Sequence, residues 1–570
     1  MRCENAKGRP GIREAHLILN LRTMSSDEPE SMSRRSFVAG ALVSSAIVAG
    51  GGASWPAVRL RTKRVRPIEQ IADGSVEERT IGQLQEAMEA GAISSREIVE
   101  AYRARIGALD HDLRAVLELN PDASAIADAL DAERRKSGAR GPLHGIPILI
   151  KDNVATADKM ETTAGSLALM GSRPPRDAFI AERLRAAGAV ILGKTNLSEW
   201  ANFRSTHASS GWSGRGGQCR NPYALDRTPS GSSSGSAAAV ASSFCAAAIG
   251  TETNGSIVSP SATCSLVGIK PTVGLVSRSA IIPISRSQDT AGPIARTVTD
   301  AAILLGAIAG ADPRDAATTV AGAKRAASYA VGLDAEALRG MRIGVPREQY
   351  FGYSTAADGI AQHALDLMRE KGAVIVDPVE IGKMGAVGDA ELEVLLYEFK
   401  AGLNEYLAEL PVGAKVRTLA DLIAFNSAHK SEEMPYFGQE ILEQAQKRGA
   451  LTDAKYTSAL AKARLNTRAK GIDAIMNAHK LDALVAPTNG PAWLIDLVNG
   501  DADGGGSSSP AAEAGYPSIT VPAGYAFGLP VGISFFGRAW SDAKLIRIAY
   551  AFEQAANARR APTYARSAAL

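Results

Sequence analysis

Cysteine is scarce in this chain of 570 residues, and no C-x-x-C pair occurs. The four cysteines are scattered along the sequence: Cys3, Cys219, Cys245 and Cys264. This distribution excludes a disulfide framework and a structural zinc site built on cysteine. Histidines and carboxylates do not cluster either, so we expect no bound metal and no other cofactor.

The chain also lacks a large excess of positive or negative charge. The formal net charge is +3, and no basic stripe interleaved with aromatic residues is visible. The sequence therefore gives no reason to expect a nucleic-acid partner. With 45% hydrophobic and 22% charged residues the composition is that of a globular protein, and the length alone predicts about three or four domains. Nothing in the sequence indicates an oligomeric state.

Long apolar runs are missing as well, and the one short run lies near the N-terminus. It extends from Phe37 to about Ala53 and follows Ser33-Arg34-Arg35-Ser36. This pattern is typical of a twin-arginine export signal, and the run is too short and too rich in Gly and Ala for a membrane anchor. We therefore expect residues 1–60 to be an export signal with an upstream extension. The rest of the protein is then periplasmic or secreted and meets the membrane only during export.

Strands and helices alternate in the first half of the remaining chain. Helices are predicted after the capping residues Thr80 and Ser94, and a third at about residues 124–135. A buried strand is predicted over residues 145–150, ending at Lys151, then a helix over 181–187 and a strand over 189–192. This alternation predicts an α/β fold.

Helices dominate the second half. Short strands are predicted at residues 342–345, 373–376, 483–486, 518–521 and 532–536, with a closing helix at 543–555. A helical excursion covers about residues 390–480. Residues 501–510 are rich in Gly and Ser, which predicts a mobile surface loop.

Two motifs suggest chemistry that their context rejects. Gly188-Ala-Val-Ile-Leu-Gly193-Lys194-Thr195 matches a phosphate-binding loop, but its inner residues favour a buried strand rather than a curled loop. Gly231-Ser-Ser233-Ser-Gly235 matches the nucleophile elbow of α/β-hydrolases, but no apolar strand precedes it. An α/β-hydrolase with Ser233 as nucleophile is kept as an alternative, although the downstream histidines lie in polar helical surroundings: His363, His429 and His479.

Residues 228–270 are unusual because two Gly/Ser-rich stretches alternate with segments of Ala, Val and Ile. Linkers are not flanked by segments suited to close packing. Small residues of this kind indicate that backbones approach each other and leave hydroxyl and N–H groups free to meet a ligand.

This region closely resembles the amidase signature family, and within it bacterial peptide amidases. The resemblance covers residues from about 75 to the end and rests on the predicted strand that ends in residues 151–153 and on several stretches: 197–204, 210–212, 220–226, 228–236, 250–257 with Pro260, 268–277, 281–284, 287–293, 486–491 and 515–536. It implies a single domain over residues 61–570, with a mixed β-sheet core surrounded by helices. This expectation replaces the several domains that length alone suggests.

The resemblance also implies a catalytic triad. It places the nucleophile at Ser256, the bridging serine at Ser232 and the general base at Lys151, with a cis peptide bond between Gly231 and Ser232. The chemistry is reasonable, because a serine hydroxyl needs an adjacent base. A lysine that ends a buried strand can supply one, since burial disfavours its charged form.

The oxyanion of the reaction needs fixed hydrogen-bond donors. The candidates are the backbone N–H groups of Thr253, Asn254, Gly255 and Ser256. Asn254 stands where peptide-amidase-like members carry Asp, which puts contacts to a cationic substrate group in doubt. Val258 stands where amidotransferase-like members carry Arg, which argues against a tRNA-linked amidotransferase.

The sequence thus predicts a serine-dependent amidase that converts a linear carboxamide to a carboxylate and ammonia or an amine. A C-terminal peptide amide or amino-acid amide is the expected substrate; aryl or aliphatic amides, and a non-catalytic binding protein on the same fold, are the alternatives. Cys264 is interpreted as a buried structural thiol rather than a rival nucleophile. Three aromatic residues are considered as pocket or core residues: Trp212, Trp493 and Tyr516.

Overall fold

The computed structural model describes residues 75–382 and 388–569. The predicted export signal at residues 1–60 lies outside the described residues. The described residues form one compact unit, in agreement with the single domain that the resemblance implies.

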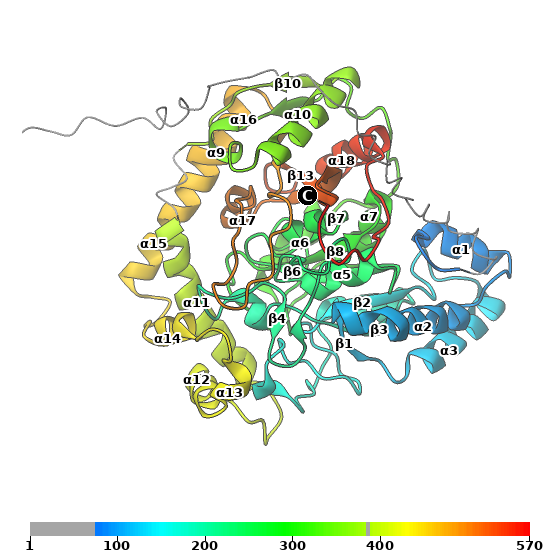
Figure 1. The fold of residues 1–570 in the computed structure, drawn as a ribbon, viewed down its shortest axis with the longest axis vertical. Helices are drawn as coiled ribbons and strands as arrows, with labels where there is room; N and C mark the ends of the chain where they lie inside the picture. The colour runs from blue at the N-terminus through cyan, green and yellow to red at the C-terminus, as the bar shows by residue number, and fades with distance from the viewer. Residues whose placement is uncertain (1–74, 383–387, 570) are drawn as a thin grey trace, which may run out of the picture. The chain divides into compact units, whose positions relative to one another are not determined.

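An eleven-stranded mixed sheet forms the centre of this unit (Figure 1). The order across the sheet is β1 (Val116–Leu119), β3 (Val190–Thr195), β2 (Pro147–Lys151), β6 (Ala247–Glu252), β8 (Thr290–Ala295), β7 (Val267–Lys270), β12 (Ser518–Ala526), β13 (Leu529–Phe536), β11 (Ala483–Pro487), β9 (Arg342–Gly344) and β10 (Val374–Val376). The strands β2, β3 and β6 run parallel, as do β9, β10 and β11, whereas the other neighbours are antiparallel.

The first helices begin where their capping residues predict. Thr80 and Ser94 each form a capping box with the residue three positions on, and so satisfy N–H groups that a helix start leaves free. The helices are α1 (Ile81–Glu89), α2 (Ser95–Leu113) and α3 (Ala123–Ser137). They lie beside the end of the sheet that holds β1, β2 and β3 (Figure 1).

Small residues allow the region after Ser233 to pack closely against the sheet. The helix α5 (Ser234–Ala241) is entirely buried and contacts β2, β3 and β6. A Cβ atom on Gly235 would lie 2.3 Å from the carbonyl oxygen of Ala115 and 2.6 Å from that of Asn196. The backbone of α5 therefore directly contacts the backbone next to β1 and β3, as the composition of this region predicts.

Further helices cover the sheet. The described ones outside the excursion are α4 (Phe179–Ala186), α6 (Val258–Thr263), α7 (Val298–Ile308), α8 (Ala321–Lys324), α9 (Arg347–Tyr350), α10 (Thr355–Glu370), α17 (Ser509–Ala514) and α18 (Asp542–Ala556). The helices α9, α10 and α16 (Asp473–Ala478) lie near β10, at the end of the sheet opposite α1–α3 (Figure 1).

The helical excursion is a series of separate helices rather than one long tract. They are α11 (Gly388–Ala408), α12 (Leu419–Ala428), α13 (Lys430–Glu433), α14 (Glu440–Gln446), α15 (Ala454–Arg464) and, after a π-helical segment over Leu465–Ile472, α16 (Asp473–Ala478). Pro411 and Gly413 follow α11, where neither residue supports a continued helix. Apolar side chains of α11, α12 and α14 pack on Trp200, Phe203 and Ile284. Within the described residues, we find no helix with the length and apolarity needed to span a bilayer.

Candidate active site

Lys151 is the last residue of β2, between the parallel strands β3 and β6. Its side chain is fully buried, which is unusual for lysine. The Nζ atom donates to Ser232 Oγ at 2.7 Å, to Ser233 Oγ at 3.1 Å and to Thr251 Oγ1 at 2.9 Å. The predicted lysine and the predicted bridging serine therefore lie in direct contact.

The surroundings of Lys151 favour a neutral amine. Burial lowers the pKa of Lys151 to about 7, although the negative charges of Asp289 and Glu252 act in the opposite direction. Among the described residues, no carboxylate forms an ion pair with Nζ. A lysine with a pKa near neutrality can act as a base at physiological pH, whereas an exposed lysine cannot.

Ser232 precedes α5, at the carboxyl ends of β2 and β6. The peptide bond between Gly231 and Ser232 is cis, as the resemblance implies. The carbonyl oxygen of Ser232 accepts the N–H of Ser198 at 3.1 Å. The residue is fully buried within the protein but lines a pocket.

Ser256 lines the same pocket, in the turn between β6 and α6. Its carbonyl oxygen accepts the N–H of Ser233 at 3.2 Å, which holds the turn against the residues before α5. Its hydroxyl forms no hydrogen bond with any described residue, whereas that of Ser232 is bonded to Lys151. The structure thus contains the contact between Lys151 and Ser232 but, among the described residues, no hydrogen bond between Ser232 and Ser256.

The turn at residues 253–256 presents unused backbone donors. Within the described part of the chain, none of its four N–H groups donates to a protein acceptor, and all four residues line the pocket. Glu252 Oε2 accepts instead the next two N–H groups, of Ile257 at 2.7 Å and of Val258 at 3.0 Å. Gly255 has φ +83°, a conformation that side chains disfavour. The geometry is suited to binding an oxyanion.

The side chain of Asn254 is bound by residues that the sequence could not indicate. Its Nδ2 atom donates to Glu391 Oε1 at 2.9 Å, and Ser508 Oγ donates to its Oδ1 at 2.7 Å. Glu391 belongs to α11, and Gln288 donates to the same carboxylate oxygen at 2.9 Å. The amide of Asn254 therefore links the turn to the helical excursion.

The pocket has a volume of about 420 Å³. Its walls come from residues 201–210, 230–232, 253–259 and 488–508, together with Ile284 and Leu395. The composition of residues 501–510 predicts a mobile surface loop, yet residues within 501–508 line the pocket and α17 begins at Ser509. Of the three aromatic candidates, Trp493 lines the pocket, whereas Trp212 and Tyr516 belong to buried clusters.

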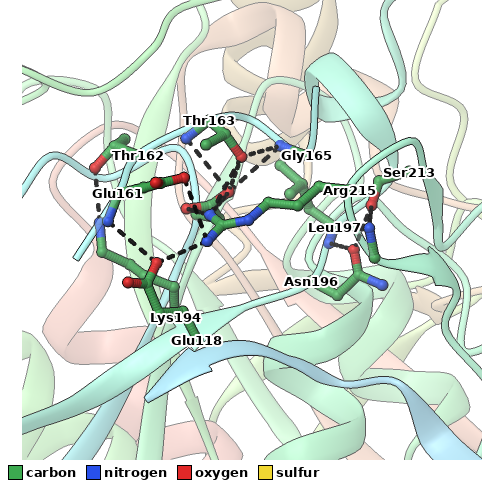
Figure 2. Close-up of polar contacts among 12 residues, drawn as sticks. Glu118, Glu161, Thr162, Thr163, Gly165, Lys194, Asn196, Leu197, Ser213 and Arg215 are labelled. Atoms are coloured by element: carbon green, nitrogen blue, oxygen red, sulfur yellow. Dashed lines mark hydrogen bonds and ion pairs between the residues drawn. The ribbon is translucent and has the colours of Figure 1, made fainter. Parts of the chain in front are cut away.

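The rejected phosphate-binding motif is a strand in the structure. Lys194 is fully buried in β3, and its Nζ donates to Val154 O at 2.6 Å and to Thr162 Oγ1 at 2.8 Å. Figure 2 shows Lys194 directed at Thr162, while Arg215 reaches Glu118 from the neighbouring loop. These hydrogen bonds connect Lys194 to the segment that follows β2, so its ammonium group is not available to a nucleotide.

The α/β-hydrolase alternative is also disfavoured by the geometry. Ser233 is fully buried, its hydroxyl donates to Thr251 O at 3.1 Å, and it does not line the pocket. No histidine is among the described residues that line the pocket. Cys264 is buried, and burial raises its pKa to about 12, in agreement with a structural thiol. The described residues contain no group of His, Cys, Asp and Glu that could hold a metal ion.

Comparisons with known proteins agree with this geometry. The family model for amidases matches residues 97–546. The native peptide amidase from Stenotrophomonas maltophilia is 53% identical, with a TM-score of 0.81 over 86% of this chain and 99% of that one. A probable amidase of Arabidopsis thaliana is 43% identical over 86% of this chain and 92% of its own length.

A more distant solved structure is that of an amidase family protein from Bacillus anthracis. It is 36% identical, with a TM-score of 0.78 over 86% of this chain and 93% of that one. The residues that the family model matches include Lys151, Ser232 and Ser256. The chain therefore belongs to the amidase (amidase signature) family and is an amide-hydrolysing enzyme.

Proposed function

We propose that this enzyme hydrolyses C-terminal peptide amides or amino-acid amides through Lys151, Ser232 and Ser256. One observation carries the proposal. A buried lysine, without a carboxylate partner among the described residues, lies 2.7 Å from Ser232 Oγ, in a pocket that Ser256 also lines.

The reaction begins with Lys151 as a neutral amine. Its lone pair accepts the proton of the Ser232 hydroxyl, and Ser232 in turn accepts the proton of Ser256 as the Ser256 hydroxyl turns towards it. The Ser256 oxygen attacks the carbonyl carbon of the amide. The N–H groups of residues 253–256 stabilise the oxyanion, and loss of one such donor typically costs about 3–4 kcal/mol.

The second half of the reaction reverses the relay. The proton held by Lys151 returns through Ser232 to the leaving nitrogen, and the C–N bond breaks. Ammonia departs, and the acyl group remains bound to Ser256 as an ester. Water then attacks the ester carbonyl and gives up a proton to the relay, the ester C–O bond breaks, and the Ser256 hydroxyl is restored. Proton donation and removal both pass through one lysine, whose pKa of about 7 suits both roles.

The choice of substrate rests on two arguments. Similarity to a peptide amidase at 53% identity favours peptide amides over aryl and aliphatic amides, which are the second candidates. Val258 occupies the position at which amidotransferase-like members carry Arg, which disfavours transfer of ammonia to a tRNA-linked substrate.

The test is ammonia release from a panel of C-terminal peptide amides, amino-acid amides, aryl amides and simple aliphatic amides. We expect the peptide and amino-acid amides to have the highest kcat/KM. A fluorophosphonate should label Ser256, identified by mass spectrometry of the modified peptide. Labelling of Ser233 instead, or preference for aryl amides, would overturn the respective part of the proposal.

A further prediction concerns the groups that face Lys151. Asp289 and Glu252 both raise its pKa, and Asp289 has the larger effect. Burial raises the pKa of Asp289 itself to about 6, so it is mostly ionised at pH 7. Asp289→Asn removes the charge and keeps an oxygen for the N–H groups of Ile284 and Ser285, which donate to Oδ2 at 2.8 Å. We expect the acid limb of the pH profile of kcat/KM to move down by roughly half a unit to one unit.

The measurement is the profile between pH 5 and 9 for both enzymes. An unchanged or higher midpoint in Asp289→Asn would contradict the assignment of this limb to Lys151.

A further inference from the structure

The lining of the active-site pocket carries negative charge without compensation. Asp501 and Asp503 line it, whereas none of its described lining residues is Lys, Arg or His. Both acids belong to the loop after Trp493, which forms the wall remote in sequence from the Ser232 and Ser256 segments. Within the described part of the chain, neither aspartate forms an ion pair.

Asp501 fixes the position of this loop. Its carboxylate accepts the N–H of Ser210 at 3.0 Å and the indole N–H of Trp493 at 2.9 Å. Ser210 and Trp493 also line the pocket, so the loop is attached to the wall at residues 201–210 and to the earlier part of its own wall. The negative charge is therefore held at a defined place in the pocket rather than on a free chain.

Asp503 is exposed and oriented by a short local contact. Its Oδ1 atom accepts the N–H of Gly505 at 2.6 Å, and Gly505 lines the pocket as well. The carboxylate is exposed and therefore accessible to a ligand. A cleft lined by one sign of charge concentrates ligands of the opposite sign.

Asn489 supplies an independent indication of a ligand. It is 5% exposed and lines the pocket. Neither its Nδ2 nor its Oδ1 has a hydrogen-bond partner in the described structure. A buried carboxamide normally has partners, because leaving its donor and acceptor unpaired is unfavourable. A peptide group, with one N–H and one C=O, would complement both atoms.

We propose that this end of the pocket selects amides whose acyl part carries a peptide group and a positive charge. Asn489 binds the peptide group, and Asp503, together with Asp501, attracts the ammonium or guanidinium group. The same charges disfavour the carboxylate product, which promotes its release. This proposal rests on the proposed function, because it names the class of amide that the enzyme hydrolyses.

The experiment compares two N-acetylated dipeptide amides that differ only at one side chain, lysine in one and acetyl-lysine in the other. For the wild type at low salt we expect kcat/KM about fivefold higher for the lysine peptide, the upper range for one exposed charge pair. The ratio should fall towards one in about 0.5 M NaCl, because salt screens the attraction. It should also fall towards one in Asp503→Asn.

Asp334→Asn is the matched control. Asp334 is likewise exposed and accepts the N–H two residues on, of Glu336 at 2.9 Å, but it does not line the pocket. This variant should keep the wild-type ratio. Asn489→Leu should lower kcat/KM for the dipeptide amides about tenfold more than for propionamide, which has no peptide group.

Hydrolysis of both dipeptide amides at equal rates, or a ratio that Asp503→Asn leaves unchanged, would overturn the charge selection alone. An equal effect of Asn489→Leu on dipeptide amides and propionamide would overturn the role of Asn489. If the enzyme hydrolyses neither dipeptide amide and is active only on aryl amides, the proposed function itself is overturned.

Discussion

Replacement of Lys151 by Met is expected to lower kcat by about 10²- to 10⁴-fold, the usual contribution of a general base. The wild-type kcat/KM should rise about tenfold per pH unit below pH 7 and level off above it. The reason is that burial lowers the pKa of Lys151 to about 7 and only the neutral amine accepts a proton. The residual activity of Lys151→Met should lack this acid limb. Steady-state ammonia release between pH 5 and 9 measures both effects.

The same substitution should leave the protein folded and change how its stability depends on pH. The pKa of Lys151 is about 7 in the folded chain and about 10.4 when exposed. Between these values the unfolded chain binds a proton that the folded chain does not, so this group makes stability rise with pH. Lys151→Met removes that contribution, and the free energy of unfolding should rise less steeply between pH 7 and 10.

The dependence should not vanish, because two other buried lysines act in the same direction. Burial lowers the pKa of Lys194 and of Lys270 to about 8.

If Lys151→Met retains more than a tenth of the wild-type kcat, or an acid limb at the same pH, the catalytic role of Lys151 is contradicted. Loss of activity with a large fall in Tm would indicate a structural role instead.

The catalytic candidates are predictable because the family resemblance that assigns them rests on motifs that are local in sequence. Lys151 ends an apolar run, and Ser232 and Ser256 lie in Gly/Ser-rich stretches whose composition is unlike that of a linker. The capped helices α1 and α2 are predictable for the same reason, since a capping box needs only four residues.

Some strands in the centre of the sheet are not predictable from the sequence pattern. Half of the strand β6 is Ala and Gly, which have low β propensity, and β8 contains Pro293. Pro293 is paired with Ile249 of β6, whereas β8 pairs with β7 only at Ile294 and Ala295, so no β7 residue in the ladder is opposite the proline. Close packing of small residues thus overrides propensity, and sequence patterns that depend on large apolar residues miss such strands.

The residues that form the pocket walls could not be predicted from the sequence for a different reason. Glu391 meets Asn254 across 137 residues of sequence, and Asp501 meets Ser210 across 291. Gly and Ser around Asp501 are typical of an exposed loop, and nothing within the loop indicates which surface it covers. Such contacts exist only once the sheet and the helical excursion have formed.

The largest effect is expected for Ser256→Ala, which should lower kcat by about 10⁴-fold or more. The Ser256 hydroxyl has no hydrogen bond to any described residue, so its removal leaves no buried group unpaired and Tm should stay within about 2 °C of the wild type. Ser232→Ala should also lower kcat, by about 10²- to 10⁴-fold, because it interrupts proton transfer to Lys151. In that variant Lys151 keeps Ser233 and Thr251 as partners.

The double variant Ser232→Ala/Ser256→Ala distinguishes a proton relay through both serines from two independent contributions to catalysis. Residues that act as one unit are not additive, so Ser232→Ala should cost little further activity once Ser256 is absent. The measurement is single-turnover ammonia release by the two single variants and the double variant, with fluorophosphonate labelling as a second readout. Labelling should disappear in Ser256→Ala and become slower in Ser232→Ala, because Ser256 keeps its oxygen but loses its path to the base. Full-rate labelling of Ser232→Ala would show that Ser256 is activated by another group.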